Sequence, residues 1–279
     1  MRQAGHTVLG YVANAHSVRV FDAQQSLGFQ GLGPLPVDAL ATADWVWITV
    51  GDDAIASAAS QVNWQPHQVA LHCSGATELD QLGSQTRRGS IGFHPLQIFS
   101  QPDVALQHLP GSSVGIEVQA QAQQAADLWV EVCALASSLQ LKPLPIASGQ
   151  RALYHAGAGY AASALVSMLA EATTLWREAG IDTDQALKAL LPLSAGALGS
   201  VEAKGLAGAV AGPVARGDAG VVQQHLQALQ TLGPNAGLLY QQVAKRQLDL
   251  LAAAQQLAPQ YISALETALD TNDRTKKIS

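Results

Sequence analysis

The sequence changes character near Ile146, and this change constrains the fold more than any other feature. Before it, short apolar and β-branched runs alternate with helical or turn-like stretches of about ten to twenty residues, the spacing typical of βαβ units in a parallel sheet. After it, helical periodicity continues almost unbroken to Ala268. The sequence therefore predicts an α/β domain with a parallel sheet at residues 1–147 and an all-α helical domain at residues 148–279.

Strands are expected at the β-branched runs of the first domain: His6–Ala13, Asp44–Val50, Gln68–Cys73, Ser90–Phe93, Ser113–Val118 and Gln140–Pro145. A helix is expected at Ala120–Ser138, where apolar residues recur at helical spacing. In the second domain a single long helix is expected from Arg151 to about Ala179. Later interruptions are expected at Gly180, Pro192, Gly205–Gly220 and Gly233–Pro234, and the polar tail Asp270–Ser279 is expected to fray.

The composition excludes several functional classes. With 48% hydrophobic and 13% charged residues, the chain is neither intrinsically disordered nor a coiled coil. Its net charge is −6 and like charges never form a long run, so the sequence predicts no binding of nucleic acid or of a membrane surface. No apolar run approaches the ~18–20 residues of a transmembrane helix. The expected partner is a small-molecule substrate.

The cysteines point to a reducing compartment. Cys73 and Cys133 are too few for a disulfide framework, and no cysteine or histidine spacing suggests a metal site. A secretory signal needs a basic start and an uninterrupted apolar stretch, but Gly5 and His6 interrupt the beginning. The sequence therefore predicts a cytoplasmic protein without a bound metal.

Ligands of parallel-sheet domains bind outside the carboxyl ends of the strands, so the residues directly after each strand are the candidates for chemistry. Gly51–Asp53 follow one strand: glycine permits close backbone approach, and the alternative is that an aspartate only caps the next helix. Ser74–Ala76 and His94–Gln97 follow two others. If these strands are neighbours, the Ser74 hydroxyl and the His94 imidazole end at the same rim and could bind and deprotonate a carbinol. The alternative for His94 is a turn residue before proline.

The second domain adds further polar candidates. His155 and Ser163 share one face of the expected long helix and could contact substrate; the alternative for His155 is helix packing. Arg216 lies in the loop Ala211–Ala219, and its guanidinium suits a carboxylate or phosphate, with a salt bridge within the fold as the alternative. Asp218 is expected to cap the following helix.

Four stretches carry a resemblance to a known family: LHCSGATELDQL at Leu71–Leu82, GFHPLQIF at Gly92–Phe99, RALYHAGAGYAAS at Arg151–Ser163 and AGPVARGD at Ala211–Asp218 with His225 following. Together they resemble the Rossmann-like proteins whose C-terminal half is domain-of-unknown-function family 2520, across nearly the whole chain and in the right order. Such proteins are similar in architecture to the 6-phosphogluconate dehydrogenase group. The resemblance implies NADP or NAD as cofactor and a homodimer formed through the helical domain.

The resemblance also implies roles at the matching positions. Residues expected to bind the dinucleotide are Ala13, Asn14, Val50, Gly51, Asp52, Ser74 and Gly75, and those expected to bind substrate are Pro95, Gln97, Ser163 and Arg216. In addition, Ser74 and His94-Pro95 resemble the serine and histidine-proline arrangement of prephenate dehydrogenases, in which those side chains hold the substrate hydroxyl. Ser74, His94 and His155 are therefore the expected catalytic residues.

The sequence departs from this family at its beginning. A Rossmann domain of this kind starts with a strand and a GxGxxG turn whose amides hold the pyrophosphate. Here Met1–His6 resembles the end of the first helix, and the 279 residues contain no GxGxxG. We expect either a start further upstream or a sheet rebuilt without a normal cofactor site, because loss of the first strand would leave a gap in the middle of the sheet.

Two further departures concern single positions. Ala13-Asn14 stand where an acidic residue would favour NAD and an arginine NADP, so the cofactor preference stays open. Ser163 stands where relatives tend to carry asparagine.

Two functions from different classes follow. The first is an NAD(P)-dependent oxidoreductase acting on a small, anionic hydroxy, keto or imino compound in the cleft between the domains. The second is a non-catalytic dimeric protein that keeps the fold but has lost dinucleotide binding with the glycine loop. The missing GxGxxG favours the second, and the histidine-bearing stretches favour the first.

Overall fold

The computed structural model describes residues 1, 4–10, 40–83, 87–233 and 236–274. The described chain divides into two compact units, Met1–Val166 and Ser167–Ser279. The division falls C-terminal to the expected boundary at residues 147/148, because the first helix after that boundary packs on the sheet. The placement of functional domains at 1–147 and 148–279 stays a prediction.

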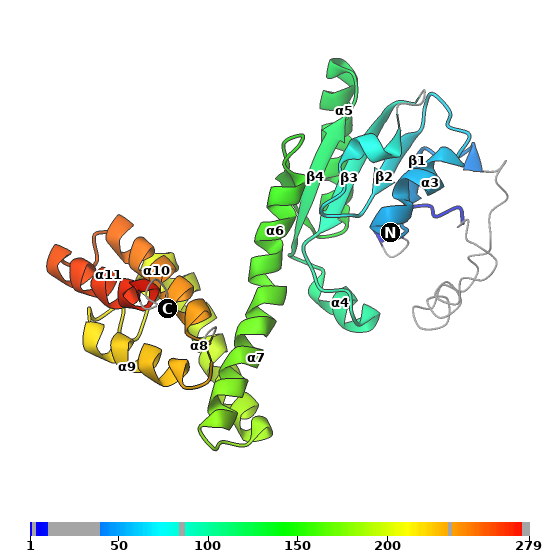
Figure 1. The fold of residues 1–279 in the computed structure, drawn as a ribbon. Helices are drawn as coiled ribbons and strands as arrows, with labels where there is room; N and C mark the ends of the chain where they lie inside the picture. Colours follow the sequence, from blue (N-terminus) through cyan, green and yellow to red (C-terminus); the bar gives the residue numbers. More distant parts are fainter. Residues whose placement is uncertain (2–3, 11–39, 84–86, 234–235, 275–279) are drawn as a thin grey trace. The chain divides into compact units, whose positions relative to one another are not determined.

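The first unit is built on a five-stranded sheet with the order β1-β2-β3-β4-β5 (Figure 1). Its strands are β1 (Trp45–Ile48), β2 (Val69–His72), β3 (Gly89–Pro95), β4 (Ser113–Gln119) and β5 (Lys142–Pro145). The expected α/β class is confirmed, with one correction: β3 and β4 are antiparallel, while the other neighbouring pairs are parallel. The sheet is therefore mostly parallel rather than wholly so.

The expected strand His6–Ala13 falls at the edge of the described residues. Residues 6–10 have no regular secondary structure, and residues 11–13 lie outside the described part of the chain. The described strands form a continuous sheet with β1 at one edge. The expected gap would lie beyond β1, on the side of the expected strand His6–Ala13, so it stays a prediction.

Helices of the first unit pack on both faces of the sheet, and the alternation of side chains along β2 shows how. Leu71 joins the apolar core beneath α5 (Ala122–Ser138), whereas Ala70 joins the core beneath α3 (Ile55–Ser60) on the opposite face. The other helical segments of this unit are η2 (Asp52–Ala54), η3 (Leu79–Leu82), α4 (Pro102–His108) and α6 (Arg151–Ala161). α7 (Ser163–Glu178) crosses the division between the units.

The single long helix expected from Arg151 to Ala179 is wrong. Helical backbone stops at Ala162, whose φ of −113° and ψ of −80° separate α6 from α7. His155 and Ser163 therefore lie on different helices, and their shared helix face does not exist. Gly180 ends the second helix with a φ of +86°, as glycine permits.

The second unit is all helical, as expected. After α7 it contains α8 (Thr183–Ala209), α9 (Ala219–Gln230), α10 (Ala236–Ala253) and α11 (Pro259–Arg274), and the last three pack around a shared apolar core. Pro192 lies inside α8 without ending it, Gly205 kinks it, and α11 continues through part of the tail that was expected to fray. None of the helices in the described chain is long and apolar enough to cross a membrane.

Candidate active site

Register places Ser74 and His94 at one rim of the sheet. In the parallel pair β2–β3, His72 lies opposite Gly92, so Ser74 and His94, two residues further along each strand, follow on the same face. On the antiparallel neighbour, Gly115 lies opposite His94. The two strands are neighbours, as expected, so Ser74 and His94 lie at the same rim of the sheet.

Three glycines make room for the first turn of α6 on that face. A Cβ at Gly92 would collide with the guanidinium of Arg151, and one at Gly115 would collide with the Tyr154 hydroxyl. A Cβ at Gly75 would collide with the His155 ring and would come within 2.9 Å of His94 Nε2. Arg151, Tyr154 and His155 have the i, i+3, i+4 spacing of one helix face, so the glycines seat this turn of α6 against the sheet.

Tyr154 and His155 bracket the His94 ring. The Tyr154 hydroxyl lies 2.9 Å from His94 Nδ1, and the two rings meet edge to face with centroids 5.6 Å apart. The His155 ring lies 5.6 Å from the His94 ring at an interplanar angle of 72°. Since Nδ1 is engaged by tyrosine, Nε2 is the His94 nitrogen that a substrate could contact. His155 itself is exposed.

The surroundings of His94 favour its neutral form. Burial is the main cause that lowers its pKa from 6.5 to about 4, and the nearby His155 and Arg151 add to this, against an opposing effect of Asp52. Burial likewise raises the pKa of Tyr154, so the tyrosine stays protonated. At neutral pH the pair is an uncharged imidazole hydrogen-bonded to an uncharged phenol.

Ser74 is held by its own loop. Its Oγ lies 2.8 Å from Asp52 Oδ2 and 2.8 Å from Thr77 Oγ1, and it accepts hydrogen bonds from the backbone N–H groups of Ala76 and Thr77. A hydroxyl has one proton to donate, so it can serve only one of the two oxygens at a time. The N-cap of η2 is Gly51, without a side-chain cap bond, so the interpretation of an aspartate as the cap is wrong. Asp52 bonds to Ser74 instead.

A buried polar layer lies beneath this rim, and the sequence did not reveal it. The fully buried Arg151 donates from Nη2 to the Ser74 carbonyl oxygen, and its Nη1 lies 3.4 Å from Glu117 Oε2. Its neighbour His72 is fully buried, and neither of its ring nitrogens has a hydrogen-bond partner among the described residues. The available signal was Gly92 and Gly115, two glycines inside the expected strands Ser90–Phe93 and Ser113–Val118.

The remaining expected site residues lie elsewhere or outside the described chain. The Gln97 side-chain amide donates to the His108 carbonyl oxygen and to Ser112 Oγ, so it is engaged by the connection between β3 and β4. Pro95 ends β3, and Ser163 begins α7. Arg216 is exposed in the second unit and forms no ion pair within the described residues. Ala13 and Asn14 lie outside the described residues.

The second unit has its own polar features. Asp218 caps α9 by accepting a hydrogen bond from the Val221 N–H, which confirms the expected cap. His225 Nδ1 on that helix lies 2.8 Å from the Tyr240 hydroxyl.

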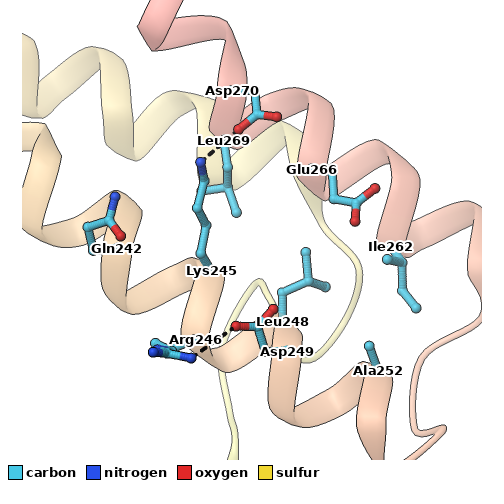
Figure 2. A pocket seen from close by; sticks show the side chains of 10 residues that line it. All are labelled: Gln242, Lys245, Arg246, Leu248, Asp249, Ala252, Ile262, Glu266, Leu269 and Asp270. Atoms are coloured by element: carbon cyan, nitrogen blue, oxygen red, sulfur yellow. Dashed lines mark hydrogen bonds and ion pairs between the residues drawn. The ribbon is translucent and has the colours of Figure 1, made fainter.

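A hollow of about 460 Å³ lies between α10 and α11. Figure 2 shows its charged side chains reaching one another, Lys245 to Asp270 at 2.7 Å and Arg246 to Asp249 at 3.6 Å. None of the expected site residues lines it.

A metal centre has no support in the described part of the chain, where no group of three histidine, cysteine or acidic side chains is placed to hold an ion.

The fit of the candidate site to a dinucleotide is incomplete. Val50, Gly51 and Asp52 are exposed at the carboxyl end of β1 and could meet a cofactor, whereas the space in front of Gly75 is filled by His155 and His94. The described residues do not form a pyrophosphate cradle.

A family model matches part of the chain. The family model described as "Domain of unknown function (DUF2520)" matches residues 115–247, which include Glu117, Arg151, Tyr154 and His155. No protein of curated function matches the sequence.

Several solved structures share the fold. A Bacteroides fragilis protein described as a "putative NADP oxidoreductase" is 20% identical, with a TM-score of 0.65 over 89% of this chain and 90% of that one. A Thermotoga maritima protein is 22% identical, with a TM-score of 0.64 over 75% and 79%. An NADH-preferring ketol-acid reductoisomerase from an uncultured archaeon is 13% identical, with a TM-score of 0.58 over 100% and 89%. The protein thus has the Rossmann-like fold of these structures and carries a DUF2520 domain at residues 115–247.

Proposed function

We propose that this chain is an NAD(P)-dependent oxidoreductase acting on a small, anionic hydroxy, keto or imino compound. The observation that carries the proposal is the hydrogen bond between the Tyr154 hydroxyl and His94 Nδ1 beside Ser74, at the carboxyl ends of β2 and β3. It holds an imidazole where ligands of such sheets bind. The shared fold supports a nicotinamide cofactor, because structures named for NADP or NADH have it.

The chain's own residues would move the proton. A bound nicotinamide would accept or supply the hydride. The step uses the His94 tautomer whose Nδ1–H donates to the Tyr154 hydroxyl oxygen, because Nε2 is then unprotonated. When a carbinol is oxidised, its hydroxyl proton passes to His94 Nε2, and in the reverse direction the same nitrogen returns it. Tyr154 holds Nδ1 and so fixes the orientation of the ring.

An anionic substrate would make His94 a better base. An imidazole whose pKa lies near 4 is a weak base in the unliganded protein. A carboxylate bound beside the ring would favour the imidazolium form and raise this pKa toward the working pH. The exposed His155, next to His94, is placed to contact such a group.

We expect the full chain to oxidise NADPH or NADH in the presence of small 2-keto or cyclic imino acids, assayed with millimolar cofactor. Its affinity for either cofactor is expected to be weaker than micromolar, because the sequence has no GxGxxG turn to hold the pyrophosphate. Calorimetric titration measures the affinity, and the fall in reduced-cofactor absorbance measures turnover.

Matched neutral substrates sharpen this test. Aldehydes and ketones with the same carbon skeleton but no carboxylate should react more slowly than the acids. A micromolar or tighter dissociation constant would contradict the expected weak binding. Absence of turnover with every acid at saturating cofactor would favour the second function, a non-catalytic dimeric protein.

We also propose that the chain forms a homodimer through its helical part. α8 carries apolar side chains on its exposed surface at helical spacing: Leu187, Leu191 and Leu198, the last two 50% and 57% exposed. Apolar surface of this kind is typical of an interface. We expect a dimer with an interface above the ~1,600 Å² of a standard complex.

Light scattering at micromolar concentration measures this assembly, and a monomeric mass would refute it. The double variant Leu191→Glu/Leu198→Glu is expected to shift the mass toward the monomer, since it places charges in an apolar interface. Gln185→Glu, which adds a charge to the exposed first turns of the same helix, is the matched control and should stay dimeric.

A further inference from the structure

Arg151 joins three separate parts of the first unit. It is the first residue of α6, its Nη2 donates to the Ser74 carbonyl oxygen in the loop after β2, and its Nη1 faces Glu117 on β4. The guanidinium occupies the space that Gly92 leaves open on β3. One fully buried side chain thus connects the start of α6 with the loop after β2 and with two strands.

The charge of Arg151 is incompletely balanced. Its only ion pair among the described residues is the long contact of 3.4 Å to Glu117, and burial raises the pKa of that carboxyl. Its Nε has no hydrogen-bond partner in the same part of the chain. A buried cation that is paired only over this long distance exerts an electrostatic effect on groups several ångströms away, because little water screens its charge. Its charge lowers the pKa of both His94 and Tyr154.

We propose that Arg151 is a positioning residue of the Ser74–His94 site: seated on Gly92, it fixes the backbone at Ser74 relative to α6 and supplies the positive charge beneath the reacting oxygen. The proposal rests on the proposed function, since it assigns a role at the same site. A fixed positive charge there favours a substrate oxygen that gains negative charge as its proton leaves. The charge of Arg151 therefore adds to the expected preference of the site for anionic substrates.

The proposal predicts different effects for the two members of the ion pair. In the full chain, Arg151→Met should raise the pH midpoint at which His94 titrates by about 0.5 to 1 pH unit, because a nearby cation is removed. Glu117→Gln should leave this midpoint close to that of the wild type, because burial raises the pKa of Glu117 and its carboxyl is therefore mostly protonated near pH 4, where His94 titrates. The titration of His94 is followed by NMR of histidines labelled at Cε1, with His94→Asn used to assign the resonance.

Two variants separate charge from packing. Arg151→Lys keeps the charge and should keep the His94 midpoint closer to wild type than Arg151→Met does. Gly92→Ala keeps the arginine but forces it from its seat, and should change the Ser74 amide resonance. If Arg151→Met does not fold, Gly92→Ala still decides the question.

The proposal is overturned if the His94 midpoint is the same in wild type and Arg151→Met, or if a folded Gly92→Ala leaves the Ser74 resonance unchanged. These measurements need neither substrate nor cofactor. A protein that shows the midpoint shift for Arg151→Met but no turnover would support the role of Arg151 in the site and contradict only the proposed oxidoreductase activity. With an identified substrate, a positioning role predicts that Arg151→Lys lowers kcat more than it raises KM.

Discussion

Replacing His94 by asparagine is expected to lower turnover about 100- to 10,000-fold, the usual effect of removing a positioned acid or base. The fold should persist, because His94 lies at the open end of β3 and is only partly buried. Cofactor affinity should also persist, since His94 is not among the residues expected to bind the dinucleotide. Steady-state kinetics with an active keto or imino acid measure the effect, and circular dichroism confirms the fold.

Two neighbouring variants separate proton transfer from positioning. Tyr154→Phe removes the hydrogen bond to Nδ1 but keeps both rings, so its loss should be smaller than that of His94→Asn. His155→Asn should raise KM more than it lowers kcat, because His155 is exposed and lies beside the His94 ring. A loss of less than about threefold in kcat/KM for His94→Asn would falsify the proton-transfer role and leave His94 as a turn residue before Pro95.

The positions of β1 to β5 could be predicted from sequence, but the direction of one of these strands could not, and residues 6–10 of the expected strand His6–Ala13 have no regular secondary structure. The β-branched and apolar residues of a run such as Gln68–Cys73 indicate a buried strand, and β2 lies within that range. The same pattern looks identical in either direction, so nothing in Ser113–Val118 distinguished the antiparallel β4 from a parallel strand. The break at Ala162 was missed for a related reason, because the residues around it are good helix formers.

The site could be predicted in part. Ser74 and His94 were found because polar residues after neighbouring parallel strands must meet at one edge. Arg151 and Tyr154 were missed, because their roles depend on which glycines face α6, and this follows from the register of three strands. Only the structure shows that Gly92 accepts the guanidinium and that Gly115 accepts the phenol.

His72 is expected to make the protein lose stability on acidification. It is fully buried, its ring nitrogens have no partner among the described residues, and burial, helped by Arg151, lowers its pKa from 6.5 to about 4. Between these values the unfolded chain binds a proton that the folded chain does not, so the free energy of unfolding falls as the pH falls. The free energy of unfolding keeps its full value above pH 6.5. It falls progressively toward pH 4, by about 3 kcal/mol in total for a pKa difference of this size.

Urea unfolding at a fixed protein concentration, at pH 7 and near pH 4.5, measures this loss. His72→Leu should be nearly neutral or stabilising at pH 7, because it replaces a buried polar ring whose nitrogens have no partner by an apolar side chain. On acidification it should lose about 2 to 3 kcal/mol less than wild type. It should keep a smaller acid dependence, since His94 is also depressed in pKa. His67→Leu is the matched control: His67 is exposed, so this variant should follow the wild-type pH dependence. Equal acid loss in wild type and His72→Leu would show that the buried ring does not carry the effect.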